Sequence, residues 1–336
     1  MKFMSMPDKQ ASLPGRILIG IFLLLDMMVT SVTIGPVLAQ SKKKADKDDA
    51  IKLESELVTL DATVTDKDGN YIRDLKGDDF VVYEDGVLQK LDFFGTDEKA
   101  ELTRPLAAVF ALDISGSIQP EEIVKQRDAA ESFVRLVRPE SVFAVLAFNY
   151  QIRVLQDFTS DPGKISQSFR KIGPAEGSTK IFQSIDRAVS MLKRGPMWRG
   201  GRRLRRVVIV ITDGYDSVDP IDQTDLIRRA NDSAVTVYSI TLPSYMPGVG
   251  QKQRALTLLD ASHIVPATGG ADFSADSGDF TQAFKAIAEE IRASYTLAYY
   301  PPEGGRHDGR VHQIRVELKK PGLLLKTSRQ SYVAQK

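Results

Sequence analysis

The chain contains 336 residues, of which 42% are hydrophobic and 26% charged, and its net charge is +1. These values are typical of a globular protein with room for one large and one small domain. The near-neutral charge gives no reason to expect nucleic acid as a partner. The chain has no cysteine, which excludes structural disulfides and the bacterial lipid anchor that is attached to a cysteine.

The N-terminus has the pattern of an export signal. Basic residues precede an apolar run at 17–25, and small residues before position 40 resemble a cleavage site. Asp26 interrupts the apolar stretch, so an uncleaved membrane anchor over 17–38 is the alternative. We therefore expect residues 1–39 to be a signal peptide or N-terminal anchor of an exported protein, periplasmic or extracellular.

Two regions with strand periodicity flank the centre of the chain. After a charged linker at 40–52, apolar and polar residues alternate within 53–100, where the pair Asp85-Gly86 predicts a tight hairpin. The other region, 294–334, contains further strand patterns at 294–300, 311–318 and 323–326. We expect these two regions to form one small, discontinuous all-β sandwich with a larger domain inserted between its halves.

Strands and helices alternate within the inserted region, 104–293. Near-continuous apolar runs predict parallel strands that are covered on both faces, and helical stripes separate them. An antiparallel edge strand is expected at 151–156. The apolar runs lie at 106–112, 142–148, 207–211 and 234–240, and the helical stripes at 181–192 and 280–291. The predicted fold class is α/β, with a doubly wound, mostly parallel sheet and helices on both faces.

Five oxygen-bearing side chains follow strands or begin a helix in this region. Asp113, Ser115 and Ser117 come directly after the first apolar run, Asp213 follows the third, and Thr179 precedes a helical stripe. In a parallel sheet such positions converge on one edge. Hydroxyl and carboxylate oxygens suit magnesium, manganese or calcium better than zinc or copper. Each residue is also a common cap or turn former, but that explanation does not account for the set.

The five positions resemble the metal ion-dependent adhesion site of the von Willebrand factor type A (VWA) domain, which uses D-x-S-x-S, a threonine and a second aspartate. The flanked arrangement is similar to a group of secreted bacterial proteins of this type. The resemblance implies a bound Mg²⁺, or Mn²⁺ or Ca²⁺, whose open position accepts an Asp or Glu carboxylate from a protein partner. It therefore implies an adhesion or interaction module of the cell envelope or exterior.

Two other functions are considered. A structural envelope or assembly protein could keep the fold without using the ion, and a metal-dependent hydrolase could use the ion to activate water. The hydrolase is disfavoured because His263, His307 and His312 offer no obvious general base, and no G-x-S-x-G motif surrounds the serines. We expect the protein not to be an enzyme, and His307 and His312 to be solvated turn residues.

A basic run at 193–206 surrounds the single tryptophan. Trp198, Arg199, Arg202 and Arg203 are candidates for contact with an acidic partner or an anionic membrane, and a merely solvated loop is the alternative. The basic run precedes the predicted strand at 207–211, whereas Asp213 follows the end of that strand. We therefore expect the basic run at the opposite end of the sheet from the metal site.

Overall fold

A computed structural model describes most of the chain beyond the N-terminal region. The described residues are 57–96, 104–173, 175–214, 220–242, 257–275, 279–302 and 308–334. The predicted signal or anchor, the charged linker and His307 lie outside them. Within these ranges no helix has the length and apolar character needed to cross a membrane.

A six-stranded sheet forms the centre of the inserted region, in the order β12-β11-β10-β5-β6-β7. All neighbours are parallel except β7, which runs antiparallel to β6 at the edge. Every residue of β5, β6, β10 and β11 is buried, as expected for apolar strands covered on both faces. The strands are β5 (Leu106–Asp113), β6 (Val142–Phe148), β7 (Ile152–Thr159), β10 (Arg205–Thr212), β11 (Val235–Thr241) and β12 (Asp272–Ser274).

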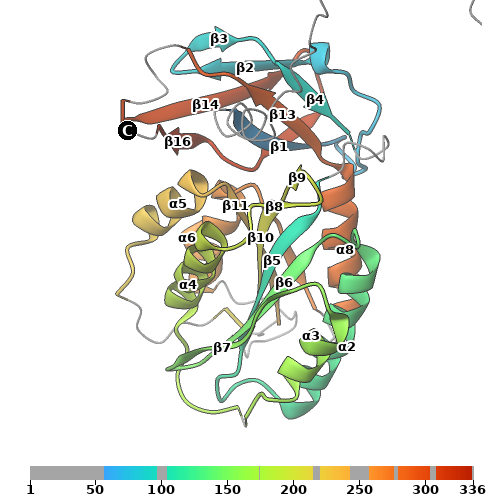
Figure 1. The fold of residues 1–336 in the computed structure, drawn as a ribbon, viewed down its shortest axis with the longest axis vertical. Coiled ribbons are helices and arrows are strands. Elements are labelled where there is room, and N and C mark those ends of the chain that lie inside the picture. Colours follow the sequence, from blue (N-terminus) through green and yellow to red (C-terminus); the bar gives the residue numbers. More distant parts are fainter. Residues whose placement is uncertain are drawn as a thin grey trace, which may run out of the picture. The chain divides into compact units, whose positions relative to one another are not determined.

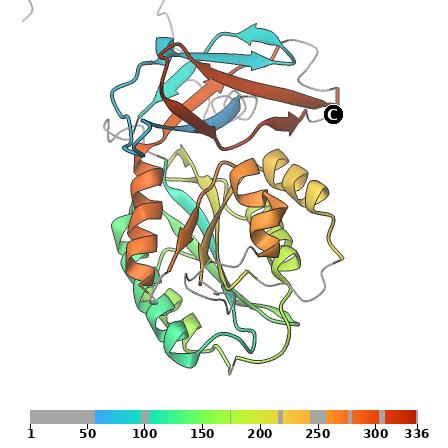
Figure 2. The same cartoon turned by 180° about the vertical axis from the view of Figure 1, so that it is seen from behind.

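Helices cover both faces of this sheet (Figures 1 and 2). One face carries α2 (Pro120–Leu136), α3 (Pro162–Phe169) and α8 (Phe280–Ala293). The other carries α4 (Ile181–Arg194), α5 (Gln223–Asp232) and the short helices α6 (Leu258–Ser262) and α7 (Ile264–Ala267). The predicted fold class, a doubly wound and mostly parallel α/β sheet, is confirmed.

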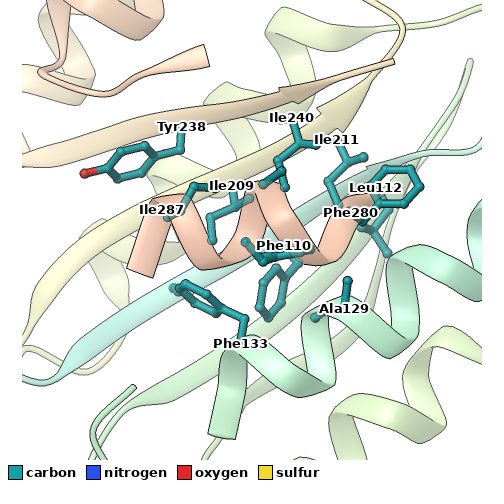
Figure 3. Close-up of a cluster of buried hydrophobic side chains, with 14 of the residues drawn as sticks. Phe110, Leu112, Ala129, Phe133, Ile209, Ile211, Tyr238, Ile240, Phe280 and Ile287 are labelled. Carbon is teal, nitrogen blue, oxygen red and sulfur yellow. The ribbon is translucent and has the colours of Figure 1, made fainter. Parts of the chain in front are cut away.

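Aromatic side chains fill the core on the α2 and α8 face. Figure 3 shows Phe110 of β5 between the two helices, directed toward Phe133 of α2. The rings of Phe110 and Phe133 lie 6.1 Å apart in an edge-to-face arrangement, and Phe110 meets Phe284 of α8 at 5.8 Å. These contacts fix both helices on β5, the strand that ends at Asp113.

The flanking segments form two four-stranded sheets, in the orders β15-β1-β13-β4 and β16-β14-β2-β3. Both sheets contribute to one buried apolar cluster, which includes Leu60, Val82, Tyr295 and Ile314. Whether they constitute a sandwich domain in their own right stays a prediction. The strands are β1 (Val58–Thr65), β2 (Phe80–Glu84), β3 (Val87–Gln89), β4 (Phe93–Gly95), β13 (Tyr295–Tyr299), β14 (Val311–Leu318), β15 (Leu324–Thr327) and β16 (Ser331–Val333), with a 3₁₀ turn at Gly77–Asp79.

A buried ionic seam joins β1 to the start of β10. Asp61 lies 3.1 Å from Arg205 Nε and 3.2 Å from Arg104 Nη1, and it accepts a hydrogen bond of 3.1 Å from the Thr296 hydroxyl. The Lys326 ammonium is paired with the buried Glu290 of α8. Asp61 neutralises the charge of Arg205, so this arginine can be buried as the first residue of β10. The strand therefore begins two residues before the apolar run at 207–211 from which it was predicted.

The expectation that His312 is a solvated turn residue is wrong. His312 lies inside β14 and is buried, with Nδ1 2.8 Å from Asp85 Oδ2 and Nε2 3.2 Å from Asp308 Oδ1. Burial favours the neutral imidazole, but hydrogen bonds and the charges of the two aspartates outweigh it and raise the pKa of His312. The residue is a structural part of the flanking sheets.

Candidate metal-binding edge of the parallel sheet

Asp113 is the last residue of β5 and is held by two protein donors. Its Oδ1 accepts a hydrogen bond of 2.8 Å from the Ser115 backbone N–H. Its Oδ2 accepts one of 2.6 Å from the hydroxyl of Thr212, the last residue of the neighbouring strand β10. The carboxylate is fully buried, so these bonds fix its orientation. Each oxygen keeps a further lone pair for a water or a cation.

The electrostatics of the edge favour a positive charge beside Asp113. Burial and, to a smaller extent, the nearby negative charge of Asp213 raise the pKa of Asp113 to about 6, although the hydrogen bonds from Thr212 and Ser115 lower it. A carboxyl group in this position loses its proton more readily if a cation lies next to it. Asp213 directly follows Thr212, whose hydroxyl bonds Asp113, so the two predicted carboxylates lie at the carboxyl ends of neighbouring strands.

The two serine hydroxyls lie side by side. Ser115 Oγ and Ser117 Oγ are 3.2 Å apart, with Ser115 buried and Ser117 exposed. Adjacent ligands of an octahedral magnesium with bonds of about 2.1 Å are about 3.0 Å apart, and those of calcium are about 3.4 Å apart. The serine spacing lies between these values, so the pair fits either ion.

Backbone hydrogen bonds clamp the segment that carries Thr179 against the segment that carries Ser115. The Glu176 N–H donates to Ile114 O at 3.0 Å, and the Gly116 N–H donates to Gly177 O at 3.1 Å. Two residues beyond this clamp, Thr179 is 4% exposed and directly precedes Lys180, the N-cap of α4. The structure therefore brings the threonine segment onto the serine segment, as the sequence predicts.

Thr212 is a site residue to which sequence reasoning assigned no role. It stands between the apolar run and Asp213, and its hydroxyl both donates to Asp113 and accepts the Gly214 N–H at 3.0 Å. Gly214 has φ +82°, and a Cβ there would lie 2.6 Å from the hydroxyl oxygen of Thr257. The sharp turn after Asp213 thus requires glycine. The sequence did contain a signal for Thr212, because it is a hydroxyl residue at the end of a buried strand and directly precedes an aspartate.

The donor set has the chemistry of a hard-cation site. Within the described ranges no three His, Cys, Asp or Glu side chains gather as a metal-binding group, and the predicted ligands here are three hydroxyls and two carboxylates. Oxygen-only donors suit magnesium, manganese or calcium. The residues that the structure shows at this edge therefore fit the cation that the sequence predicted.

The candidate partner-contact residues lie at the other end of the sheet. Trp198–Arg199 and Arg202–Arg203 form a two-stranded ladder, β8 and β9, just before β10 begins. Its arginines make bonds within the chain: Arg199 Nη2 donates to Ser160 Oγ at 2.9 Å, and Arg203 Nη1 to Thr59 Oγ1 at 3.4 Å. Trp198 is partly buried. A partner or membrane contact here stays a prediction.

The chain thus contains a doubly wound α/β domain whose sheet has hydroxyl and carboxylate side chains at its carboxyl edge. The family model of the von Willebrand factor type A domain matches residues 108–286, just over half of the chain, and the chain belongs to this family. Domains of this family typically mediate protein interaction and adhesion. The predicted family is thus confirmed.

Similarity to known proteins is otherwise distant. Integrin alpha-M of Mus musculus is 27% identical over 137 residues, which are 39% of this chain and only 12% of that protein. An aerotolerance-related membrane protein from Bacteroides fragilis is 21% identical, covering 55% of this chain and 98% of that one with a TM-score of 0.43. Proximal thread matrix protein 1 from the mussel byssus, with a zinc-occupied MIDAS motif, is 15% identical, covering 56% and 48% with a TM-score of 0.44.

Proposed function

We propose that this protein binds a protein partner through a divalent cation held at the carboxyl edge of the parallel sheet. The ligand set is Asp113, Ser115, Ser117, Thr179 and Asp213, and an Asp or Glu carboxylate of the partner completes the coordination. The observation that carries the proposal is the meeting of three segments at one edge: the serine loop and the end of β10 both bond Asp113, and the segment before α4 bonds the serine loop.

The donor set explains why such a site would attract a carboxylate. Hydroxyl groups are neutral ligands, so a cation bound mainly by them keeps most of its positive charge. Asp113 is held by Thr212 and by the Ser115 amide, which orients its oxygens before any ion binds. Ser117 is exposed, so the ion it contacts would be accessible to a partner side chain.

The remaining parts of the proposal follow from the sequence. The N-terminal 39 residues support export to the periplasm or cell exterior, and the flanking sheets would act as a discontinuous support for the binding domain. The protein is proposed not to be an enzyme. The alternative is a structural envelope protein that keeps the fold and does not use the ion.

Metal binding is tested first, with the metal alone. Isothermal titration of the purified chain with Mg²⁺ and Mn²⁺ should show one site, and the variants Asp113→Asn and Ser117→Ala should lose it. Ser132→Ala is the matched control, because this half-buried serine lies on α2, away from the proposed ligands, and among the described residues its hydroxyl donates to the Asp128 backbone carbonyl. Equal binding by the wild type and both site variants would contradict the ligand set.

Partner binding is tested second, by pull-down from an envelope fraction with Mg²⁺ and again with EDTA. The proposal expects a protein that is retained only with Mg²⁺ and is lost from Ser117→Ala. Retention that EDTA does not change would instead support the structural alternative.

A further inference from the structure

A groove lies between the edge strand β7 and the C-terminal half of α4. It has a volume of about 440 Å³ and is lined by residues of both elements and by the chain just after α4. Phe158 and Met191 form an apolar floor, and Val154 stands at the rim with 40% of its surface exposed. Phe158 packs so closely on Gly195 that a Cβ there would lie 2.6 Å from its ring. The position of the Phe158 ring in the groove is therefore fixed by its contact with the backbone at Gly195.

Two arginines of α4 line the same groove. Arg187 and Arg194 are both exposed and are seven residues apart, on one face of the helix. Among the described residues no carboxylate is paired with either of them, whereas Arg229 of the neighbouring α5 is bonded to Asp186 at 2.7 Å. On the strand side the groove carries one acid, Asp157. Positive charge is thus concentrated along α4.

The groove is separate from the metal-binding edge. Helix α4 begins at Ile181, next to Thr179, and ends at Arg194, so the groove lies toward the far end of a helix about 20 Å long. The strand residue Thr159 beside it pairs with Phe143, near the start of β6, which again places it away from the carboxyl edge. A ligand in the groove would not contact the predicted cation.

We propose that this groove binds an extended acidic peptide segment of a partner protein, with an apolar side chain between two carboxylates. The two arginines are about 10 Å apart along the helix, and alternate residues of an extended chain face the same way at about 6.6 Å per pair. Positions i and i+4 of such a chain are about 13 Å apart, and the long, exposed arginine side chains can spread to bridge the difference of about 3 Å. A carboxylate, an apolar residue and a second carboxylate at positions i, i+2 and i+4 would then reach Arg187, the apolar floor and Arg194. Asp157 repels carboxylates from the strand side, so the acidic side chains of the peptide face α4.

The proposal is tested with a displayed library of random peptides, selected on the full chain in the presence of EDTA. EDTA removes divalent cations and so prevents cation-dependent binding at the sheet edge. The result of the peptide selection is therefore independent of the result of the metal titration. Enriched peptides should carry two acids that flank an apolar residue. A synthetic peptide of the enriched sequence should bind Arg187→Ser/Arg194→Ser at least about tenfold more weakly, since two charge-assisted contacts are lost.

Two further variants control for non-specific effects. Arg135→Ser removes an exposed arginine of α2, whose side chain is 61% exposed, and should leave peptide affinity unchanged. Val154→Glu adds a negative charge at the exposed rim and should weaken binding without affecting the fold, measured by circular dichroism. Enrichment of neutral or basic peptides, equal affinity for the double-arginine variant, or self-association of the chain through this face would overturn the proposal.

Discussion

Asp61→Asn tests whether the buried seam between β1 and β10 stabilises the protein. The substitution keeps the size of the side chain and removes the charge that faces Arg205 and Arg104, whose side chains are 6% and 18% exposed. Removal of one partner from a buried ion pair leaves the other charge uncompensated, which costs about 3–5 kcal/mol. We expect the free energy of unfolding to fall by about 3 kcal/mol, at the lower end of this range, because the amide oxygen still accepts one hydrogen bond.

The assay is urea unfolding followed by circular dichroism, with Asp128→Asn as the control. Asp128 also contacts an arginine, Arg127 at 2.8 Å, but its side chain is 63% exposed, so its loss should cost less than about 1 kcal/mol. Equal costs for the two substitutions would refute the reasoning that burial makes the Asp61 contacts strong.

The pH dependence of stability of the wild type and of Asp61→Asn gives a second test, in which the direction of the change is defined. Burial alone would raise the pKa of Asp61, but the charges of Arg205 and Arg104 outweigh it and hold the pKa below its ordinary value of 3.8. Because the folded-state pKa is lower than the unfolded one, the contribution of the charge is fully present above 3.8 and is lost as pH falls through the folded-state pKa. The wild type and Asp61→Asn should therefore converge in stability in strong acid.

Three further outcomes are expected from the same unfolding assay. Tyr299→Phe removes the hydroxyl that donates to the buried Glu84 at 2.6 Å and should cost about 1–3 kcal/mol; no loss would mean that water replaces the hydroxyl. Gly214→Ala should destabilise more than Gly322→Ala, since both have φ near +80° but only the first Cβ would meet another side chain; equal losses would assign the effect to φ alone. Because the pKa of His312 is raised in the folded state, its contribution is present below about 6.5 and is lost as pH rises through the folded-state pKa. The cost of His312→Gln should therefore be larger at acidic than at alkaline pH, and a cost that grows with pH would contradict the assignment.

Strands that are buried on both faces, and strands with one buried and one exposed face, could be predicted from the sequence. The predicted strand 142–148 agrees with β6 at both ends, and 311–318 agrees with β14, because apolar runs and strict alternation each reflect local burial. The start of β10 was predicted two residues late, since Arg205 is polar and the partners that make its burial favourable, Asp61 and Ser294 among them, are remote in the sequence. Strand β16 was missed because its three residues are too few to show a strand period.

The error for His312 has the same physical origin. The sequence just before it, at 303–310, is polar and contains three glycines, which suggested a loop, whereas Asp85, which bonds it, lies on a hairpin more than two hundred residues earlier. For the candidate site, Asp113 ends β5 and Ser115 follows it, as the apolar run indicated, because strand ends in a parallel sheet have a fixed location, whereas their role as metal ligands stays a prediction. The contact between Thr212 and Asp113 depends on strand order, which a single sequence does not specify.

The strands by which the chain enters and leaves the inserted region are hydrogen-bonded to each other. Strand β4 precedes that region and β13 follows it directly after α8, with Thr296 opposite Gly95. When tension is applied between residues 57 and 334, the ladders that join β1 to β13 and β14 to β16 carry the force, so the parallel sheet is not stretched. The inserted region thus stays mechanically unloaded until those ladders rupture, and a pulled molecule keeps the loops at the carboxyl edge of the sheet in place.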